Sequence, residues 1–261
     1  KEEVYNKLLE LNITDKNKRK QHIKYAQQTK KQKDINSTNK CPKCRGELVE
    51  RTSMSRMFGG CTNLTILDIS QLITTNVSQM YGMFQGCRGL TSFDLSTFDT
   101  SKVTTMAGMF SGCISLTFLD LSMFITTSLT ETGSWWSGGM FSGCTSLTNI
   151  DLSSFNTSKV TDMREMFKGC GGLTSLDLST FVTNVLTITG GTTTGTGMFE
   201  DCTNLINIDL RNANFTTVTT YGRMFFNITN GITIIVKDAT TQTWINARLT
   251  DVGKTGTVTI Y

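Results

Sequence analysis

The chain has 261 residues, of which 38% are hydrophobic and 18% charged, and its formal net charge is +4. This composition is typical of a globular protein rather than a disordered one. A single histidine, together with the lack of a phosphate-binding loop and of a Ser-His-Asp order, predicts that the chain is not an enzyme. No apolar run is long enough to cross a bilayer, so we expect no membrane span.

Residues 1–40 are predicted to form a basic helical head. The first 56 residues hold 15 Lys and Arg against 7 Asp and Glu, a net charge of +8. The densest part, residues 16–20, reads Lys-Asn-Lys-Arg-Lys. Such a segment is either a solvated basic helix without a ligand or a contact for nucleic acid through phosphate neutralisation. Any nucleic-acid binding is therefore expected through the head only.

Residues 41–56 contain a Cys-Pro-Lys-Cys turn between Cys41 and Cys44, of the kind that directs two thiolates at one zinc ion. The stretch from Cys41 to Cys61 resembles the first part of the zinc ribbon in the tails of nuclease-related-domain proteins. Cys61 lies where the third ligand is expected, and repeat sequence then replaces the second half of the ribbon. A structural zinc site takes four protein ligands. We interpret this segment as a truncated ribbon without a cofactor, with zinc bound by Cys41, Cys44 and Cys61 as the alternative.

Seven copies of one unit, numbered 1 to 7 below, fill residues 57–227, and each begins with Met-Phe. The first residues of the units are Met57, Met83, Met109, Met140, Met166, Met198 and Met224. They are separated by 26, 26, 31, 26, 32 and 26 residues. A fixed period of this length is typical of stacked repeats, in which each unit buries its apolar face only against its neighbours.

Each unit is predicted to contain a strand, a turn and a short helix. Leu119, Asp120 and Leu121 alternate between apolar and polar side chains, as a short strand does. Val103 and Met106 begin a series of apolar residues spaced by three or four, as on one face of a helix. We therefore expect a parallel sheet on one face of the stack and short helices on the other.

These units resemble the BspA-like leucine-rich-repeat family of surface proteins, in its mycoplasma-type form. The shared pattern is Met-Phe-x-x-Cys-x-x-Leu-x-x-Leu-Asp-Leu-Ser-x-Phe-x-Thr-x-x-Val-x-x-Met, and it recurs in register from about Met57 to Arg223. The resemblance implies an α/β leucine-rich-repeat-like solenoid that attaches to surfaces or binds a protein partner of unknown identity. It implies a cell-surface location, whereas reduced cysteines are typical of the cytoplasm.

One cysteine recurs in each of the first six units. We expect these side chains to form a structural ladder of buried, reduced thiols, with disulfides between neighbouring units as the alternative. They are Cys61, Cys87, Cys113, Cys144, Cys170 and Cys202.

One aspartate also recurs in each of these units, between two inward apolar residues. The aspartates are therefore expected on the outer face of the sheet, where like charges repel. They predict a solvated acidic stripe, a calcium-binding strip or a docking face for a basic partner. They are Asp68, Asp94, Asp120, Asp151, Asp177 and Asp209.

Two units are longer than the others, and their extra residues lie within 130–139 and 187–197. Both segments are rich in glycine, which is expected to interrupt the short helix. Insertions in repeat proteins project as loops on one face, often the binding face, and tryptophan is favoured in interaction hot spots. The candidate binding residues are Trp135, Trp136, Thr192, Thr193 and Thr194. The alternative is that one tryptophan covers the end of an interrupted helix.

Residues 228–261 are predicted to cap the stack with a strand, a helix and a strand. Residues 232–236 and 256–261 have the composition of strands, and Asp238 is expected to cap a helix between them. A repeat stack needs a cap because its last unit otherwise exposes an apolar end and an open strand edge.

The repeats, the acidic row and the insertions together predict a non-enzymatic protein-binding scaffold of the adhesin type. Two alternatives remain. One is a nucleic-acid-associated protein with a basic, zinc-ribbon-like head. The other is a recombined repeat cassette without a function of its own.

Overall fold

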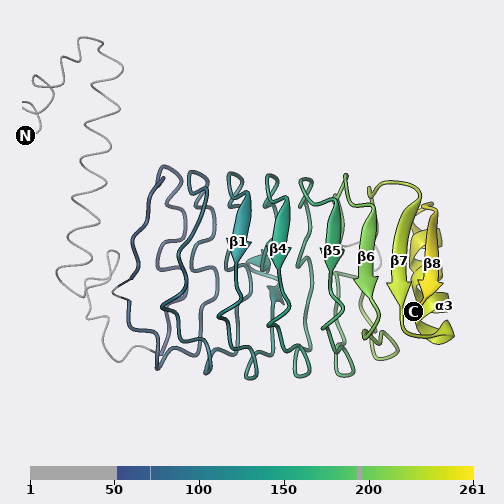
Figure 1. The fold of residues 1–261 in the computed structure, drawn as a ribbon, viewed down its shortest axis with the longest axis horizontal. Coiled ribbons are helices and arrows are strands. Elements are labelled where there is room, and N and C mark those ends of the chain that lie inside the picture. The colour runs from purple at the N-terminus through teal and green to yellow at the C-terminus, as the bar shows by residue number, and fades with distance from the viewer. Residues whose placement is uncertain (1–51, 71, 193–195) are drawn as a thin grey trace, which may run out of the picture.

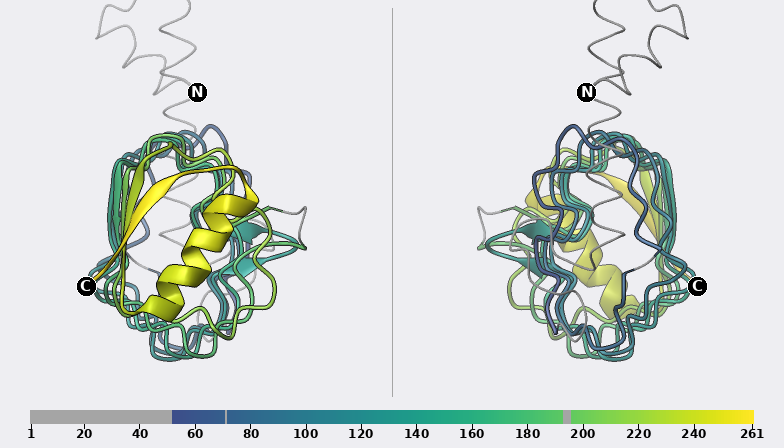
Figure 2. Two further views of the ribbon diagram at one scale, coloured as in Figure 1. Left: turned by 90° about the vertical axis from the view of Figure 1, so that its right-hand side faces the viewer. Right: turned by 90° about the vertical axis from the view of Figure 1, so that its left-hand side faces the viewer.

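The computed structural model describes residues 52–70, 72–192 and 196–261. The repeats form a row of similar coils that lie side by side along the long axis of the molecule (Figure 1). Viewed along that axis, the coils superimpose as a closed outline (Figure 2), and the buried side chains of every unit fill its interior. The predicted head at 1–40, and Cys41 and Cys44 of the Cys-Pro-Lys-Cys turn, lie outside the described residues.

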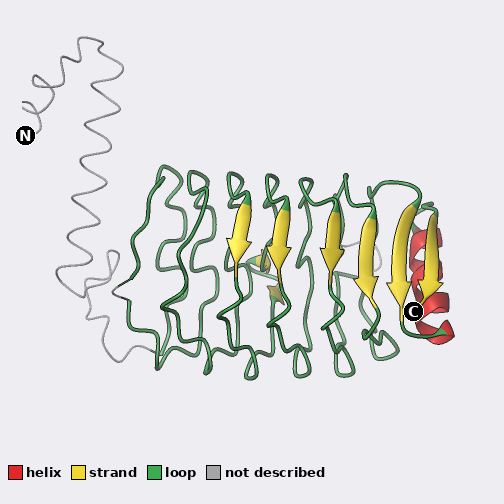
Figure 3. Ribbon diagram, in the orientation of Figure 1, coloured by secondary structure: helices red, strands yellow, loops and turns green. Residues whose placement is uncertain are grey.

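One wall of the coils carries short parallel strands (Figure 3). The strands are β1 (Phe118–Asp120), β4 (Asn149–Asp151), β5 (Ser175–Asp177), β6 (Asn207–Leu210), β7 (Ile232–Val236) and β8 (Gly256–Ile260). β1 pairs with β4, and a four-stranded sheet has the order β5-β6-β7-β8, with every pair parallel. The apolar residue at the centre of each three-residue strand is buried, as Leu119 and Leu176 illustrate. The parallel sheet predicted from the alternation is therefore confirmed.

The opposite wall is held by a second ladder of single parallel bridges. One residue of each unit takes part, and the series runs Ser53, Gln79, Thr105, Glu131, Asp162, Ile188 and Thr220. This bridge ladder therefore holds every unit in register with its neighbours, and the paired strands β1-β4 and β5-β6-β7-β8 add contacts on the other wall.

The prediction of a short helix in each unit is wrong. Among the described residues the single helix is α3 (Ala239–Asp251), which lies in the tail. In unit 2 the amide of Met83 donates to Met80 O, three residues back, whereas the next amide, of Phe84, donates to Met109 O of the following unit. In an α-helix both amides would donate four residues back. The apolar residues spaced by three or four therefore lie on turns, in which alternate backbone amides donate hydrogen bonds to the following unit.

A continuous column of phenyl rings fills the centre of the coils. Neighbouring ring centroids are 5.5 to 5.9 Å apart, and the ring planes lie within 20° of parallel. The rings belong to Phe58, Phe84, Phe110, Phe141, Phe167, Phe199 and Phe225. All are at most 2% exposed. This spacing is within the range that stacked aromatic pairs prefer, so each unit contributes one ring to a shared core.

Buried threonine hydroxyls join neighbouring coils at a turn that follows the recurring aspartate in the sequence. Thr126 Oγ1 accepts a hydrogen bond from Asn156 N at 2.7 Å and donates one to Asn156 O at 3.2 Å. The same double contact joins Thr100 to Ile125, Thr157 to Val182 and Thr183 to Asn214. Each hydroxyl thus satisfies both backbone groups of the residue that faces it in the next unit.

The tail contains the predicted strand, helix and strand. Asp238 caps α3, because its carboxylate accepts a hydrogen bond from Thr241 N at 2.8 Å. Ile245 and Leu249 of α3 are buried, and the Trp244 ring stacks on Phe215 at 4.9 Å between centroids. Figure 2 shows α3 crossing the open end of the last coil, so the helix covers core that would otherwise face solvent.

Candidate functional site

The first insertion forms a β-hairpin on the wall opposite the strands (Figure 2). β2 (Gly133–Ser134) pairs antiparallel with β3 (Gly138–Gly139). Trp135 and Trp136 lie at the tip, with 66% and 84% of their surface exposed. Neither indole covers the end of a helix, because this segment contains none. The alternative structural role considered for a tryptophan is therefore wrong.

The second insertion also turns back on itself. Gly190 forms an antiparallel bridge with Gly197, and Gly191 N donates to Thr196 O at 2.6 Å. Thr192 is exposed on this second hairpin, whereas Thr193 and Thr194 lie outside the described residues. Glu131 and Ile188, which precede the two hairpins, occupy the same position in the bridge ladder. The two hairpins therefore leave the coils from the same wall.

Glycines in the hairpins permit a close approach to the neighbouring coil. A Cβ atom added at Gly139 would lie 2.1 Å from Glu165 O, and one added at Gly197 would lie 2.4 Å from Met224 Cα. These distances are far too short for any side chain. The glycines therefore allow the hairpins to lie against the next unit; they do not interrupt a helix.

Arg164 supports the base of the first hairpin from the following unit. Its side chain is 3% exposed, and its Nε donates to the two carboxylate oxygens of Asp162 at 3.0 and 2.8 Å. Its guanidinium carbon lies 3.8 Å from the centroid of the Trp135 ring, a cation–π contact. The guanidinium thus covers one face of this indole, although 66% of the Trp135 surface is still exposed.

Glu165 contacts both hairpins. Its Oε1 accepts a hydrogen bond from the Thr196 hydroxyl, and its Oε2 lies 3.3 Å from where a Cβ on Gly138 would stand. The backbone φ of Glu165 is 55°, a left-handed conformation that Gly82 and Gly108 adopt at the same position of earlier units. A side chain in this conformation costs about 1–2 kcal/mol. Glu165 thus occupies a glycine position and uses its carboxylate to link the hairpins.

The buried carboxylate of Glu200 holds the end of the second hairpin through a hydrogen bond from Gly197. Glu200 is 4% exposed and accepts a hydrogen bond from Gly197 N at 2.9 Å. Arg223 Nη2 lies 3.3 Å and Lys168 Nζ 4.0 Å from its Oε1. Burying an unpaired carboxylate is costly, so these donors are what allow Glu200 to be buried.

Neither Arg164 nor Glu165 was predicted from the sequence as a site residue. The predicted residues Trp135 and Thr192 lie on separate hairpins; the consecutive residues Arg164 and Glu165 contact one hairpin each, through Trp135 and Thr196. The signal in the sequence was weak: Glu165 is a non-glycine residue where earlier units have Gly82 and Gly108.

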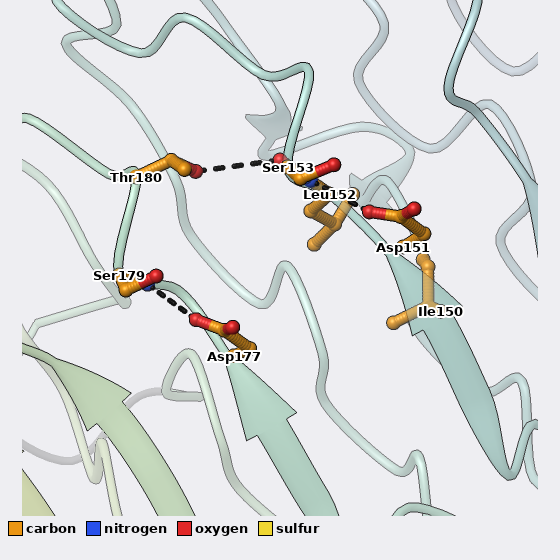
Figure 4. Close-up of a pocket in the computed structure, with 7 residues that line it drawn as sticks. All are labelled: Ile150, Asp151, Leu152, Ser153, Asp177, Ser179 and Thr180. Carbon is orange, nitrogen blue, oxygen red and sulfur yellow. Dashed lines mark hydrogen bonds between the residues drawn. The ribbon is translucent and has the colours of Figure 1, made fainter.

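The aspartate row lies on the other wall, along the strand ends. Each carboxylate accepts a hydrogen bond from the amide two residues later and so forms a turn; at Asp120, Asp151 and Asp177 this turn ends a strand. Figure 4 shows this for Asp151 with Ser153 and for Asp177 with Ser179, around a small depression. Hydrogen bonds from the following serine hold the pKa of the Asp94 and Asp151 carboxyls below its usual range.

The acidic row is thus a set of aspartate-stabilised turns as well as a line of negative charge. Asp209 differs from the other members because Arg211 pairs with its carboxylate. Among the described residues, no group of three or more His, Cys, Asp or Glu side chains is arranged to hold a metal ion. Calcium takes six to eight oxygens, and the row supplies one aspartate per unit.

The six cysteines of the ladder are reduced. Cys61 is half-buried, and the other five have no exposed surface. Each of those five thiols donates to the carbonyl of the stacked phenylalanine in the preceding unit, at 3.0 to 3.3 Å. Burial raises the pKa of Cys144 and of Cys202 to about 12. The thiolate, which is the reactive form, is therefore disfavoured.

No helix within residues 52–70, 72–192 and 196–261 combines the length and hydrophobicity that a membrane crossing requires. A family model described as "Mycoplasma protein of unknown function, DUF285" matches the chain twice, over residues 52–138 and 137–235. The two matches meet within the first inserted hairpin. Searches of curated proteins and of solved structures found no significant match, and nothing found supports the zinc-ribbon resemblance of the head.

Proposed function

Since the chain belongs to the Mycoplasma protein family of unknown function DUF285, within the BspA-like group of surface repeat proteins, we propose that it is a non-enzymatic, adhesin-like binding scaffold. The coils form a leucine-rich-repeat-like solenoid in this proposal, and the wall with the two hairpins contacts a protein partner. The bridge ladder and the phenyl column support the solenoid, because they repeat the same contacts between every pair of units.

The single observation that carries the proposal is the exposure of Trp135 and Trp136 at the tip of a hairpin that is held in place. Burying an exposed indole against a partner lowers the free energy of the complex, and tryptophan is enriched among the residues that dominate binding energy. The contacts of Arg164 and Glu165 reduce the freedom that the hairpins would lose on binding. An ordered, exposed aromatic pair is what a binding surface requires.

Binding of the purified, labelled chain to cultured epithelial cells tests this proposal. The variant with Trp135→Ala and Trp136→Ala is expected to bind at least about tenfold more weakly, because each indole is a candidate hot spot. The matched control is Met123→Ala, which removes another apolar side chain that is 63% exposed. Equal binding by the double variant, or equal losses in both variants, would contradict the proposed site.

The acidic character of the described region favours this proposal over direct nucleic-acid binding by the repeats. The described residues carry 11 Lys and Arg against 14 Asp and Glu, a net charge of −3. Such a surface repels phosphate groups. Nucleic-acid binding is therefore restricted to the head in this proposal, and a recombined cassette without a function remains the outcome if the parent chain does not bind the cells.

A further inference from the structure

We propose that the first hairpin, together with Glu165 and Thr196, forms a saccharide-binding site in which sugar rings stack on the indoles of Trp135 and Trp136. The Glu165 carboxylate then accepts hydrogen bonds from sugar hydroxyls, and the neighbouring Thr196 hydroxyl donates to them or accepts from them. This inference rests on the proposed binding function and names the chemistry that the partner presents at that site.

The indoles offer flat aromatic faces of the kind that sugar rings cover. Trp136 is 84% exposed, and Trp135 is 66% exposed although the Arg164 guanidinium covers one of its faces. An aromatic face carries partial negative charge. The C–H groups on one side of a pyranose ring carry partial positive charge. A sugar ring that lies flat on the indole is therefore attracted electrostatically, and the contact also removes apolar surface from water.

The surroundings of the indoles are polar and small. The half-buried Ser134 and three glycines (Gly133, Gly138 and Gly139) flank the indoles, Ser137 is buried, and no large apolar residue lies in the two strands of the hairpin. A stable protein–protein interface buries about 800 Å² on each side around an apolar core. Two exposed rings on a small, otherwise polar hairpin suit a ligand that combines small apolar faces with many hydroxyl groups.

The polar partners for sugar hydroxyls are held in position before a ligand arrives. The half-buried Glu165 carboxylate accepts from the Thr196 hydroxyl, and the Trp136 backbone amide donates to Ser134 Oγ at 3.2 Å. A carboxylate accepts up to four hydrogen bonds, so Glu165 keeps capacity for two neighbouring sugar hydroxyls. Groups fixed in this way lose little entropy on binding.

A mucin glycoprotein is the probe for the first test, because one preparation supplies both the protein and its glycans. The full chain is expected to bind the immobilised mucin, and enzymatic removal of the glycans is expected to weaken binding at least about tenfold. The released glycans should compete with intact mucin and change the tryptophan fluorescence of the chain. A panel of glycolipid vesicles then distinguishes lipid-linked from protein-linked saccharides.

Two outcomes separate this inference from the proposed function. If deglycosylated mucin binds as well as intact mucin, and Trp135→Ala with Trp136→Ala abolishes both, the saccharide inference is wrong and a protein-binding site remains. If the double variant binds intact mucin like the parent, the indoles are not the binding site, and both the saccharide inference and the proposed binding wall are wrong. A Glu165→Gln variant, which keeps an acceptor for Thr196, should weaken binding to released glycans without lowering the melting temperature; unchanged binding would contradict the assigned role of Glu165.

Discussion

The guanidinium of Arg164 lies 3.8 Å from the centroid of the Trp135 ring, although the two residues belong to consecutive units. Arg164 is itself held by Asp162, a residue of the bridge ladder. The position of an exposed tryptophan is therefore determined by the stacking of the coils, and anything that loosens the stack at this point will also release the hairpin.

Removing the Arg164 side chain is predicted to destabilise the protein and free Trp135. Arg164→Ala leaves the Asp162 carboxylate, which is only 14% exposed, without its cation, and this costs about 3 kcal/mol of unfolding free energy. Urea unfolding measures the loss, and the tryptophan fluorescence reports the released indole. The matched control is Arg211→Ala, whose partner Asp209 lies on the other wall and whose side chain is 32% exposed; its cost is expected below about 1 kcal/mol. Equal costs for the two variants would contradict this account.

The phenyl column is predicted to be the main source of cohesion between units. Phe110→Ala removes a ring with no exposed surface that contacts a ring on each side, and is expected to cost about 3–5 kcal/mol. Phe118→Ala changes the same residue type on the outer face of β1, where it is 50% exposed, and should cost less than about 1.5 kcal/mol. Calorimetry on both variants checks this, and a larger loss at Phe118 would show that the column is not the core.

The buried threonines are predicted to matter through their hydroxyls rather than their volume. Thr126→Val keeps the shape of the side chain but leaves Asn156 N and Asn156 O without their shared partner, at a cost of about 1–3 kcal/mol. The neighbouring exposed residue provides the control, because Thr127→Val is expected to change stability by less than about 0.5 kcal/mol. Urea midpoints for the two variants should therefore differ clearly; coinciding midpoints would rule out a role for the hydroxyl.

The buried thiols predict a loss of stability at alkaline pH. A cysteine in an unfolded chain titrates near pH 8.5, whereas burial raises the pKa of Cys144 and of Cys202 to about 12 in the folded chain. Between these values the folded protein keeps protons that the unfolded chain releases, so stability is full below about pH 8.5 and falls as the pH rises.

Melting temperatures measured from pH 7 to 10.5 check the sign of this dependence. Cys144→Ala removes one of the titrating groups and should make the fall less steep. Iodoacetamide at pH 8 is expected to label Cys61, which is half-buried, before the other five cysteines of the ladder. Rapid labelling of Cys144 in the native protein would contradict its burial.

The strands and the cap were predictable because each follows from a local rule. The alternation around Asp120 specifies a strand with one buried face, and Asp238 followed by an amphipathic segment specifies a capped helix. The turn segments were mistaken for helices because turns that place every third or fourth residue inward have the same apolar spacing as a helix. Gly108 and Gly112, both at positive φ, are the local signal against a helix.

The hairpins were predictable as projections, but their supports were not. Trp135 is conspicuous in a polar insertion, whereas Arg164 lies 29 residues away and has an ordinary neighbourhood in the sequence. Nothing local relates the two positions. Their contact exists because an insertion in one unit lies over the turn of the next, and that relationship appears only when the coils are stacked in register.

The uniform joints between coils make the length of the array adjustable. An additional coil inserted between two existing ones would meet the same phenyl ring, the same thiol acceptor and the same bridging residue on each side. Duplication or deletion of a 26-residue unit thus moves the two hairpins apart or together in steps of about 4.8 Å, the distance between paired strands. The number of units between the hairpins would then set the distance between the surfaces that a partner contacts.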